Sequence, residues 1–327
     1  MKIATVSHSH IALRQQLFFR EAAKQGHSVL MVSPGHWFNL RTTQQEIKYP
    51  DGNWELKTCK HMGDNIYTYK LLGAKDLVEK FGPDWLYIQA EPGSLLVKEA
   101  LTWNIGRRAL FVWENISIKG DGPTQLQDYD LVVCGNPEAE ALIKSWNPNT
   151  TLLLQVGVDT NHFQARPNVD RNISVAYIGR AAPEKGLPYL IQAWPTVHVL
   201  EYKDFKELPW RYSQVKVIVA YSQDVPWWKE QAPSYVVLEA LSCGCKVVTS
   251  DTAAMKYWLE GCPGVEIITG HQQPNDTLRT ERVIALKAGI QHALGSEIRS
   301  ESRDWVIERF SNPVMAKKLL EVLSEQL

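Results

Sequence analysis

Apolar strand-like segments alternate with amphipathic helix-like segments along most of this sequence. Residues 2–7 have a strand pattern, residues 13–25 a helix pattern and residues 27–33 a second strand pattern. The same alternation resumes near residue 75 and again near residue 174. Strands that are joined by helices over short connections form parallel sheets with helices on both faces. The sequence therefore predicts an α/β fold with doubly wound sheets.

The length of the chain predicts two domains. With 327 residues it is too long for one typical domain and suits two. The polar segment 166–172 contains a proline and separates the two runs of alternation, so it is the expected linker. We expect two Rossmann-like domains with a cleft between them.

The overall charge and the hydropathy pattern argue against several classes of protein. The formal net charge is −1, which gives no strong nucleic-acid signal. No apolar run approaches the ~20 residues of a transmembrane segment. The sequence starts with a strand pattern and has no signal region, so we expect a cytoplasmic chain, either free or peripheral on a membrane surface.

The cysteines lack the spacing of metal ligands. The only close pair has the form C-x-C, and no matching pair of Cys or His lies elsewhere in the sequence. Free cysteine is usually a small buried residue. We therefore expect no metal site, and reduced structural thiols at Cys59, Cys134, Cys243, Cys245 and Cys262.

The segment 231–250, QAPSYVVLEALSCGCKVVTS, predicts a buried helix followed by a buried strand. Pro233 suits the first helical position, and Gly244 ends the helix before the apolar run. Glu239 lies in the middle of the apolar helix. A buried carboxylate is costly unless a partner or a ligand binds it. The segment is therefore typical of a ligand-binding edge of an α/β sheet.

The loop 179–186 also follows a predicted strand and leads into a helix. Its glycines at both ends, with Arg180 and Lys185 between them, suit a diphosphate that is held by cations and helix-terminal N–H groups. The order of residues is neither that of a P-loop nor that of a G-x-G-x-x-G dinucleotide motif. A solvated surface pair of basic residues is the simpler alternative for this loop alone.

Four segments in order resemble motifs of the family 4 glycosyltransferases, which have the GT-B fold. YIGRAAPEKGLPYLIQAW resembles the G-R-x-x-x-E-K-G loop of that family, and QVGVDTNHF resembles its interdomain segment. QAPSYVVLEALSCGCKVVTSD resembles its E-x7-E stretch with the strand that follows. HSVLMVSP resembles its second strand. The resemblance covers most of residues 1–260.

This resemblance implies a GT-B fold and two domain roles. An acceptor-binding domain would occupy residues 1–165, and a donor-binding domain residues 166–310. A C-terminal helix at 311–327 would return to the first domain. The family generally retains anomeric configuration and needs no metal or other cofactor. The implied donor is a nucleotide-diphosphate sugar, with UDP as the favoured nucleotide.

The resemblance also implies roles for individual residues. Arg180 and Lys185, after Gly179, would neutralise the donor diphosphate and assist its departure. Glu239 would bind the ribose hydroxyls. A phosphate would bind the helix N-terminus at Pro233, Ser234, Tyr235 and Val236.

The sequence departs from the family pattern at three places. Gln231 takes the first acidic position of E-x7-E, and Glu230 lies one place earlier. The segment 7–10, SHSH, replaces a glycine-rich loop. The second half has room for one strand–helix unit fewer, with Tyr202 and Lys203 where the family contacts the base.

Polar residues at the strand ends of the first half are candidates for the acceptor side. His8 and His10 follow the first strand, and a near-neutral imidazole can orient or deprotonate a hydroxyl. Glu91 ends a later strand, and Glu114 with Asn115 ends the next. Solvated loop residues are the alternative for all five. Two aromatic residues suit either sugar stacking or burial: Trp37 and Phe38.

We expect a retaining, metal-independent glycosyltransferase of hexosyltransferase type, with a saccharide or lipid-linked saccharide as acceptor. A glycosyltransferase acting on a hydroxylated base in DNA is an alternative, which the neutral charge disfavours. A nucleotide-sugar epimerase or a sugar phosphorylase would share the architecture. An inactive nucleotide-sugar-binding relative is the alternative that is not an enzyme, because Gln231 breaks the acid pair.

Overall fold

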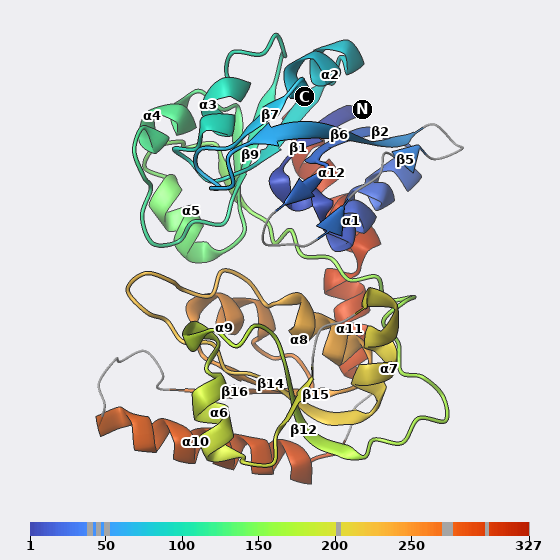
Figure 1. The fold of residues 1–327 in the computed structure, drawn as a ribbon, viewed down its shortest axis with the longest axis vertical. Coiled ribbons are helices and arrows are strands. Elements are labelled where there is room, and N and C mark those ends of the chain that lie inside the picture. The colour runs from blue at the N-terminus through green and yellow to red at the C-terminus, as the bar shows by residue number, and fades with distance from the viewer. Residues whose placement is uncertain are drawn as a thin grey trace. The chain divides into compact units, whose positions relative to one another are not determined.

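The chain folds into two compact units (Figure 1). The computed structural model describes residues 1–37, 42–43, 47–48, 53–200, 204–269, 277–297 and 301–326. Unit 1 comprises Met1–Gly157 and Met315–Leu327, and unit 2 comprises Val158–Val314. Helix α12 (Asn312–Glu325) begins in unit 2, and most of its residues belong to unit 1.

Seven consecutive strands of the sheet of unit 1, from β11 to β6, run parallel to one another. Its order is β11-β10-β9-β8-β1-β2-β6-β5, with β7 also paired to β6, and β5 and β7 are antiparallel to β6. Ile3 at the centre is opposite Trp85 on one side and Val29 on the other. The strands are β1 (Lys2–Val6), β2 (Ser28–Pro34), β5 (Ile47–Lys48), β6 (Trp54–Met62), β7 (Lys70–Leu72), β8 (Trp85–Gln89), β9 (Arg108–Val112), β10 (Leu131–Cys134) and β11 (Thr150–Leu152); β3 (His36–Trp37) and β4 (Thr42–Thr43) form a separate pair.

Helices cover both faces of this sheet. One face packs in a single apolar core against α2 (Ala74–Phe81), α3 (Leu95–Ala100), α4 (Gly122–Gln127) and α5 (Pro137–Ile143). On the other face, Phe19 of α1 (Leu13–Lys24) meets the ring of Tyr87. The indole N–H of Trp85 donates to the carbonyl of Leu323 in α12 at 3.0 Å. The unit is therefore doubly wound, as the alternation predicts.

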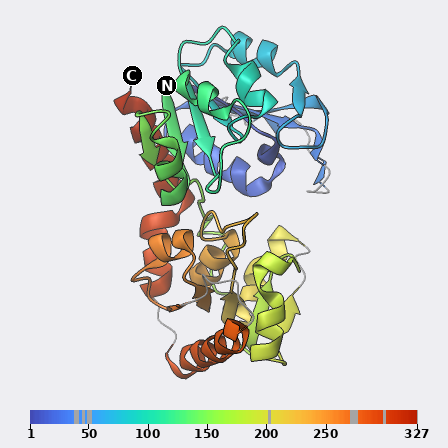
Figure 2. The same ribbon diagram turned by 90° about the vertical axis from the view of Figure 1, so that its left-hand side faces the viewer.

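The sheet of unit 2 is parallel throughout, in the order β13-β12-β14-β15-β16. Helices α6 and α10 share one core with it, and α10 lies along that face (Figure 2). On the other side α8 packs on β14 and β15, and α11 packs on α8. The elements are β12 (Ile173–Ile178), α6 (Leu187–Ala193), β13 (His198–Leu200), α7 (Leu208–Ser213), β14 (Val215–Ala220), α8 (Tyr235–Ser242), β15 (Lys246–Ser250), α9 (Ala253–Leu259), β16 (Val265–Ile268), α10 (Thr277–Gly295) and α11 (Glu301–Phe310).

The strand orders place one topological switch point in each unit. In unit 1 the chain runs outward from β1 through β2 on one side and returns to β8 on the other. In unit 2 the corresponding reversal lies between β12 and β14. In open parallel sheets, ligands bind outside the carboxyl ends of the strands at such points. Ligand sites are therefore expected at residues 7–10 and 90–94 in unit 1, and at residues 179–186 and 221–234 in unit 2.

The predicted fold class is confirmed, while several local predictions are not. The glycines at 120 and 122 predict a loop over residues 117–127, but the structure has α4 from residue 122 onward. The pattern from residue 278 to the C-terminus predicts two helices, and the structure has α11 between them. The apolar run at 151–156 predicts a strand over that range, but the strand ends at Leu152. None of the described helices is both long enough and apolar enough to cross a membrane.

Candidate functional site

The two loops at the switch point of unit 2 are in direct contact. Gly186 ends the first loop with a φ of +68°, and a Cβ there would lie 1.9 Å from the carbonyl oxygen of Tyr221. Only glycine fits both the positive φ and this close approach. The backbone N–H of Gln223 donates to the carbonyl of Glu184 at 2.7 Å. The loop 179–186 is thereby held against the segment that follows β14.

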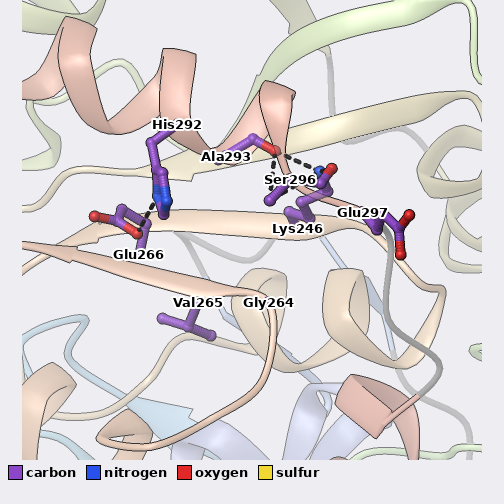
Figure 3. Close-up of a pocket in the computed structure, with 8 residues that line it drawn as sticks. All are labelled: Lys246, Gly264, Val265, Glu266, His292, Ala293, Ser296 and Glu297. Carbon is purple, nitrogen blue, oxygen red and sulfur yellow. Dashed lines mark hydrogen bonds and ion pairs between the residues drawn. The ribbon is translucent and has the colours of Figure 1, made fainter.

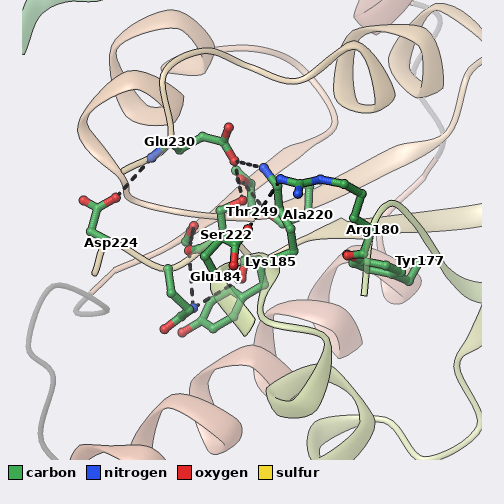
Figure 4. A network of polar contacts seen from close by, with 12 residues as sticks. Tyr177, Arg180, Glu184, Lys185, Ala220, Ser222, Asp224, Glu230 and Thr249 are labelled. Carbon is green, nitrogen blue, oxygen red and sulfur yellow. Dashed lines mark hydrogen bonds and ion pairs between the residues drawn. The ribbon is translucent and has the colours of Figure 1, made fainter. Parts of the chain in front are cut away.

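Lys185 and Glu230 form the centre of a polar network between these loops (Figure 4). Lys185 Nζ lies 2.9 Å from Glu230 Oε2 and 4.3 Å from the centre of the Trp228 ring. The Ser222 hydroxyl donates to the same carboxylate oxygen. The Glu230 side chain is only 8% exposed and that of Lys185 21%, so solvent screens this pair weakly.

Arg180 lies on the same loop and is open to solvent. Its side chain is 72% exposed, and its guanidinium is 3.4 Å from Glu184 Oε1. The Tyr177 hydroxyl donates to the Arg180 carbonyl at 2.5 Å, which anchors the backbone while the side chain extends outward. Gly179 is exposed beside it. An exposed surface pair of this kind contributes little to stability, so the guanidinium can change partner at low cost.

The N-terminus of α8 lies at the end of the second loop. Pro233 is buried and Ser234 is the N-cap residue, with no hydrogen bond from its side chain to the helix. Tyr235 and Val236 are half-buried in the first turn. The first N–H groups of a helix lack intrahelical acceptors and carry partial positive charge. This end of α8 can therefore accept an anion.

Glu239 is buried in α8 with a tyrosine as partner. It is 1% exposed, and the Tyr212 hydroxyl of α7 donates to its Oε2 at 3.1 Å. The sequence raises the question of how an acid is tolerated in so apolar a helix, and this bond is part of the answer. Tyr212 was missed, because nothing in the sequence spacing links α7 to α8.

The neighbouring candidates are less closely tied to the network. Gln231 is half-buried. Glu230, not Gln231, pairs with Lys185, so the network brings the acid one place before the expected position into contact with the loop lysine. Ser222 and Trp228 were not predicted, because they reach Glu230 and Lys185 only through the folding of the loop that follows β14. Tyr202 and Lys203 lie outside the described residues.

Unit 1 has a cavity of about 170 Å³ at its own switch point. The lining comes from the ends of β1, β8 and β9 and from the segment before β7. Aromatic rings form one wall, where Phe111 and Trp113 meet edge to face at 4.7 Å. The lining residues are Ser7, His8, Ser9, Ile66, Gln89, Ala90, Glu91, Phe111 and Trp113.

Two carboxyl groups lie at this cavity. Glu91 Oε2 accepts from the backbone N–H of Glu114 at 3.1 Å. Burial and the nearby charge of Glu114 raise the pKa of Glu91 to about 7, although Lys119 acts in the opposite direction. Glu114 in turn accepts from the Tyr67 hydroxyl at 3.2 Å and from two backbone N–H groups of its own loop. Glu91 is therefore poised to gain or lose a proton near neutral pH.

The two histidines after β1 have different environments. His8 lines the cavity, and burial lowers its pKa to about 4. Its ring packs on Trp37 at 4.7 Å and on Tyr69 at 5.4 Å. His10 is fully buried, and desolvation lowers its pKa to about 3. The expectation that His10 serves the acceptor side as a near-neutral imidazole is therefore wrong, because its ring is enclosed between the strands and α1.

Other sequence candidates have structural contacts. Asn115 is buried and donates to Glu138 Oε2 at 3.3 Å. Trp37 is 3% exposed, which confirms its interpretation as a core residue. Phe38 lies outside the described residues. All five cysteines are buried, as predicted, and none of them forms a disulfide.

A second pocket lies in unit 2, at the end of the sheet away from the switch point, and its lysine is already paired within the protein. It measures about 140 Å³ and lies at the start of β15 and β16 (Figure 3). Lys246 Nζ donates there to the carbonyls of Ala293 and Ser296 and to the Ser296 hydroxyl. These bonds use the three N–H donors of the ammonium to cap the C-terminus of α10. The described part of the chain contains no group of three or more Cys, His, Asp and Glu side chains that could hold a metal ion.

The fold is similar to that of several solved glycosyltransferases. Sucrose-phosphate synthase from Thermosynechococcus elongatus has a TM-score of 0.71 and 16% sequence identity, over 99% of this chain and 98% of that one. Anabaena Alr3699/HepE in complex with UDP and glucose has a TM-score of 0.68 and 15% identity, over 99% and 100%. A glycosyltransferase from Rickettsia africae ESF-5 has a TM-score of 0.69 and 13% identity, over 99% and 98%.

These similarities extend over both units and show that the chain has the GT-B fold with two Rossmann-like domains. No protein-family model matches the sequence. No curated protein is significantly similar to it either.

Proposed function

We propose that this protein is a retaining, metal-independent glycosyltransferase, related to family 4, that transfers a sugar from a UDP-sugar to a hydroxyl group of a saccharide or lipid-linked saccharide. The observation that carries this proposal is the Lys185–Glu230 network at the switch point of unit 2. The similar fold of HepE, which was solved with UDP and glucose, supports the choice of donor.

Unit 2 would bind the donor. Arg180 and Lys185 would neutralise the diphosphate, and the N–H groups at Ser234, Tyr235 and Val236 would bind one of its phosphates. Cations and a helix N-terminus that are already in place stabilise the leaving nucleotide as negative charge develops on it. The reaction would then need no metal ion for this step.

The two acids of unit 2 would hold the rest of the donor. Glu230 would orient Lys185 and accept hydrogen bonds from sugar hydroxyls, with Ser222 as its support. Glu239 would bind the ribose, and Tyr212 would hold its carboxylate in place in the apolar helix. Gln231 would take part through its amide, without charge.

Unit 1 would bind the acceptor in the 170 Å³ cavity. Glu91 has a pKa near 7, so its ionised form can accept a proton from an attacking hydroxyl at neutral pH. His8 would serve as a neutral hydrogen-bonding group. Glu114, Asn115 and His10 would support the wall without touching the acceptor.

The test is a donor screen followed by a transfer assay. Purified protein is mixed with UDP-, GDP- and ADP-sugars, and thermal stability is recorded, since a ligand that binds only the folded state raises the melting temperature. Radiolabelled donors are then incubated with methyl glycosides, without and with EDTA. We expect stabilisation by a UDP-sugar and EDTA-resistant transfer with retained configuration. If no nucleotide sugar is bound or cleaved, the proposal is wrong.

A further inference from the structure

The cavity of unit 1 has unpaired polar groups in its wall. Gln89 is 6% exposed, and its Nε2 has no hydrogen-bond partner among the described residues. The same holds for Nδ1 of His8. Buried polar atoms are almost always paired, and each unpaired one costs about 1–3 kcal/mol. Both residues line the cavity, so a water molecule or a polar ligand that enters it is the available partner for these atoms.

One amide atom of Gln89 lacks a partner whichever way the amide group is oriented, as the neighbouring residues show. His10 Nδ1 faces the Val32 carbonyl at 3.3 Å, so it carries the proton of the neutral ring, and Nε2 is left as an acceptor. Gln89 Oε1 lies 3.0 Å from that Nε2 and 3.3 Å from the Ser9 hydroxyl. Turning the amide over would place an N–H donor against His10 and leave the oxygen unpaired. In either orientation one amide atom of Gln89 has no hydrogen-bond partner among the described residues.

The aromatic wall is rigidly positioned. A Cβ on Gly135 would lie 2.3 Å from the Trp113 ring, so the glycine leaves the space that the indole fills. Phe111 also packs against that ring, with the two ring centres 4.7 Å apart. A flat apolar surface beside hydrogen-bonding groups suits the alternating C–H and O–H surface of a sugar ring. The volume corresponds to about six water molecules, which is the size of one ring.

The charged groups at the cavity are acidic. Glu91 belongs to the lining, and Glu114 is bonded to it through its backbone N–H. No Lys or Arg belongs to this lining within the described chain. Lys119 is the cation that acts on Glu91, and its ammonium lies over the Tyr67 ring at 4.6 Å. His8 and His10 are neutral at physiological pH because both are desolvated. The ionised form of Glu91 would repel an anionic ligand, and the described lining itself supplies no cation to compensate.

We infer that this cavity receives one uncharged sugar ring as the acceptor, and that Gln89 and Glu91 select it over phosphorylated or carboxylated sugars. In a longer or lipid-linked acceptor, the ring that enters is a neutral terminal one. This inference rests on the proposed function for the reaction itself. The preference for neutral over anionic rings concerns binding, so it can be tested even if the protein transfers no sugar.

The experiment compares methyl hexosides with hexose 6-phosphates and hexuronic acids of the same configuration. Binding to the full-length protein, with and without UDP, is measured by saturation-transfer NMR at constant ionic strength. Transfer is measured with the UDP-sugar that the wild type cleaves. We expect the neutral sugars to bind and to be glycosylated with at least about 10-fold higher kcat/KM than the anionic ones, since repulsion by one nearby charge is of that order.

Two variants and one control test the residues. Glu91→Gln preserves the shape of the side chain and removes its charge. Because Glu91 is also the proposed base, this variant is compared by NMR binding, where we expect the preference for methyl hexosides over hexose 6-phosphates to fall about 10-fold. Trp113→Ala removes the aromatic wall and should raise the KM for the neutral acceptor. Trp146→Ala, at a surface position with 42% exposure, is the matched control and should behave as the wild type.

The outcomes separate this inference from the proposed function. If the protein cleaves a UDP-sugar but prefers sugar phosphates, the inference is overturned and the proposed function stands. If neither class binds by NMR, the inference also fails. If no nucleotide sugar is cleaved, the proposed function fails, while preferential binding of neutral rings would still support the cavity assignment.

Discussion

Lys185 Nζ and Glu230 Oε2 lie 2.9 Å apart, on two loops that are separated by 45 residues in sequence. Each loop follows a strand next to the switch point of unit 2, so the fold alone brings them together. The carboxylate has a cation, the Ser222 hydroxyl and little water around it. A lysine held in this way is positioned before a ligand arrives, which lowers the cost of binding an anion.

Replacing Lys185 should remove most of the activity. We expect Lys185→Ala to lower kcat for sugar transfer by about 10²-fold or more, because the leaving diphosphate loses a positioned cation. The control is Lys287→Ala, which removes an exposed lysine from α10. Steady-state kinetics with a UDP-sugar measure both. Equal rates in the two variants would contradict the role of Lys185.

Glu230 and Gln231 compete for the first acidic position, and paired variants decide between them. We expect Glu230→Gln to reduce kcat/KM by at least about 10-fold, because Lys185 then lacks its charged partner. Gln231→Ala should cost less than about 3-fold if it contributes only a hydrogen bond to a hydroxyl. A larger effect at Gln231 than at Glu230 would show that Gln231 occupies the first position of the E-x7-E pattern.

Tyr212→Phe should destabilise unit 2. The variant removes the hydroxyl that donates to Glu239 and leaves the carboxylate in an apolar helix, so we expect a loss of about 2 kcal/mol in the free energy of unfolding. Tyr129→Phe is the control, since its buried hydroxyl donates to a neutral carbonyl at 3.0 Å and should cost about 1 kcal/mol. Urea denaturation measures the two values. A smaller loss at Tyr212 than at Tyr129 would show that the carboxylate does not depend on this bond.

Stability should decline in mild acid because of the histidines after β1. Burial lowers the pKa of His10 from 6.5 to about 3, so between these values the unfolded chain binds a proton that the folded chain does not. This stability is complete above pH 6.5 and is lost as the pH falls toward 3. His8 acts in the same direction down to about pH 4. Glu91 acts in the opposite direction between 4.5 and 7, because its pKa is raised.

The variant His10→Gln isolates one part of this pH dependence. Between pH 6 and 4, its unfolding free energy should change less steeply than that of the wild type, by about 1.4 kcal/mol per pH unit. His198→Gln, at an exposed position on β13, should keep the slope of the wild type. Chemical denaturation at several pH values measures all three proteins. An unchanged slope in His10→Gln would mean that His10 is protonated in the folded state.

Gly186→Ala should disturb the loop 179–186. The φ of +68° and the 1.9 Å approach to the Tyr221 carbonyl both oppose a Cβ, so we expect a loss of stability above about 2 kcal/mol and weaker UDP binding. Gly26→Ala is matched in φ, at +88°, but has no atom within 4 Å of the added Cβ. Gly26→Ala should therefore lower the unfolding free energy by about 1 kcal/mol, which is the cost of the positive φ without a steric clash. Calorimetry with UDP gives stability and affinity together.

The sequence by itself determined the α/β class, the doubly wound sheets and the loop 179–186 between a strand and a helix. These follow from local causes: hydrophobic periodicity specifies strands and helices, and glycine, proline and charge at fixed offsets specify a loop such as 179–186. Local patterns were weaker for α4 and α11. Neither was predicted, because short or polar helices owe their stability to tertiary packing rather than to their own pattern.

Only the tertiary structure decided which side chains meet. It paired Lys185 with Glu230, gave Glu239 a tyrosine from α7, buried His10 and formed a cavity from Gln89, Trp113 and Glu91. Each of these contacts joins segments that the order of strands in a sheet brings together. Strand order depends on the packing of the whole core and is not encoded at any single spacing, and for that reason the chemistry of the site became visible only in the folded chain.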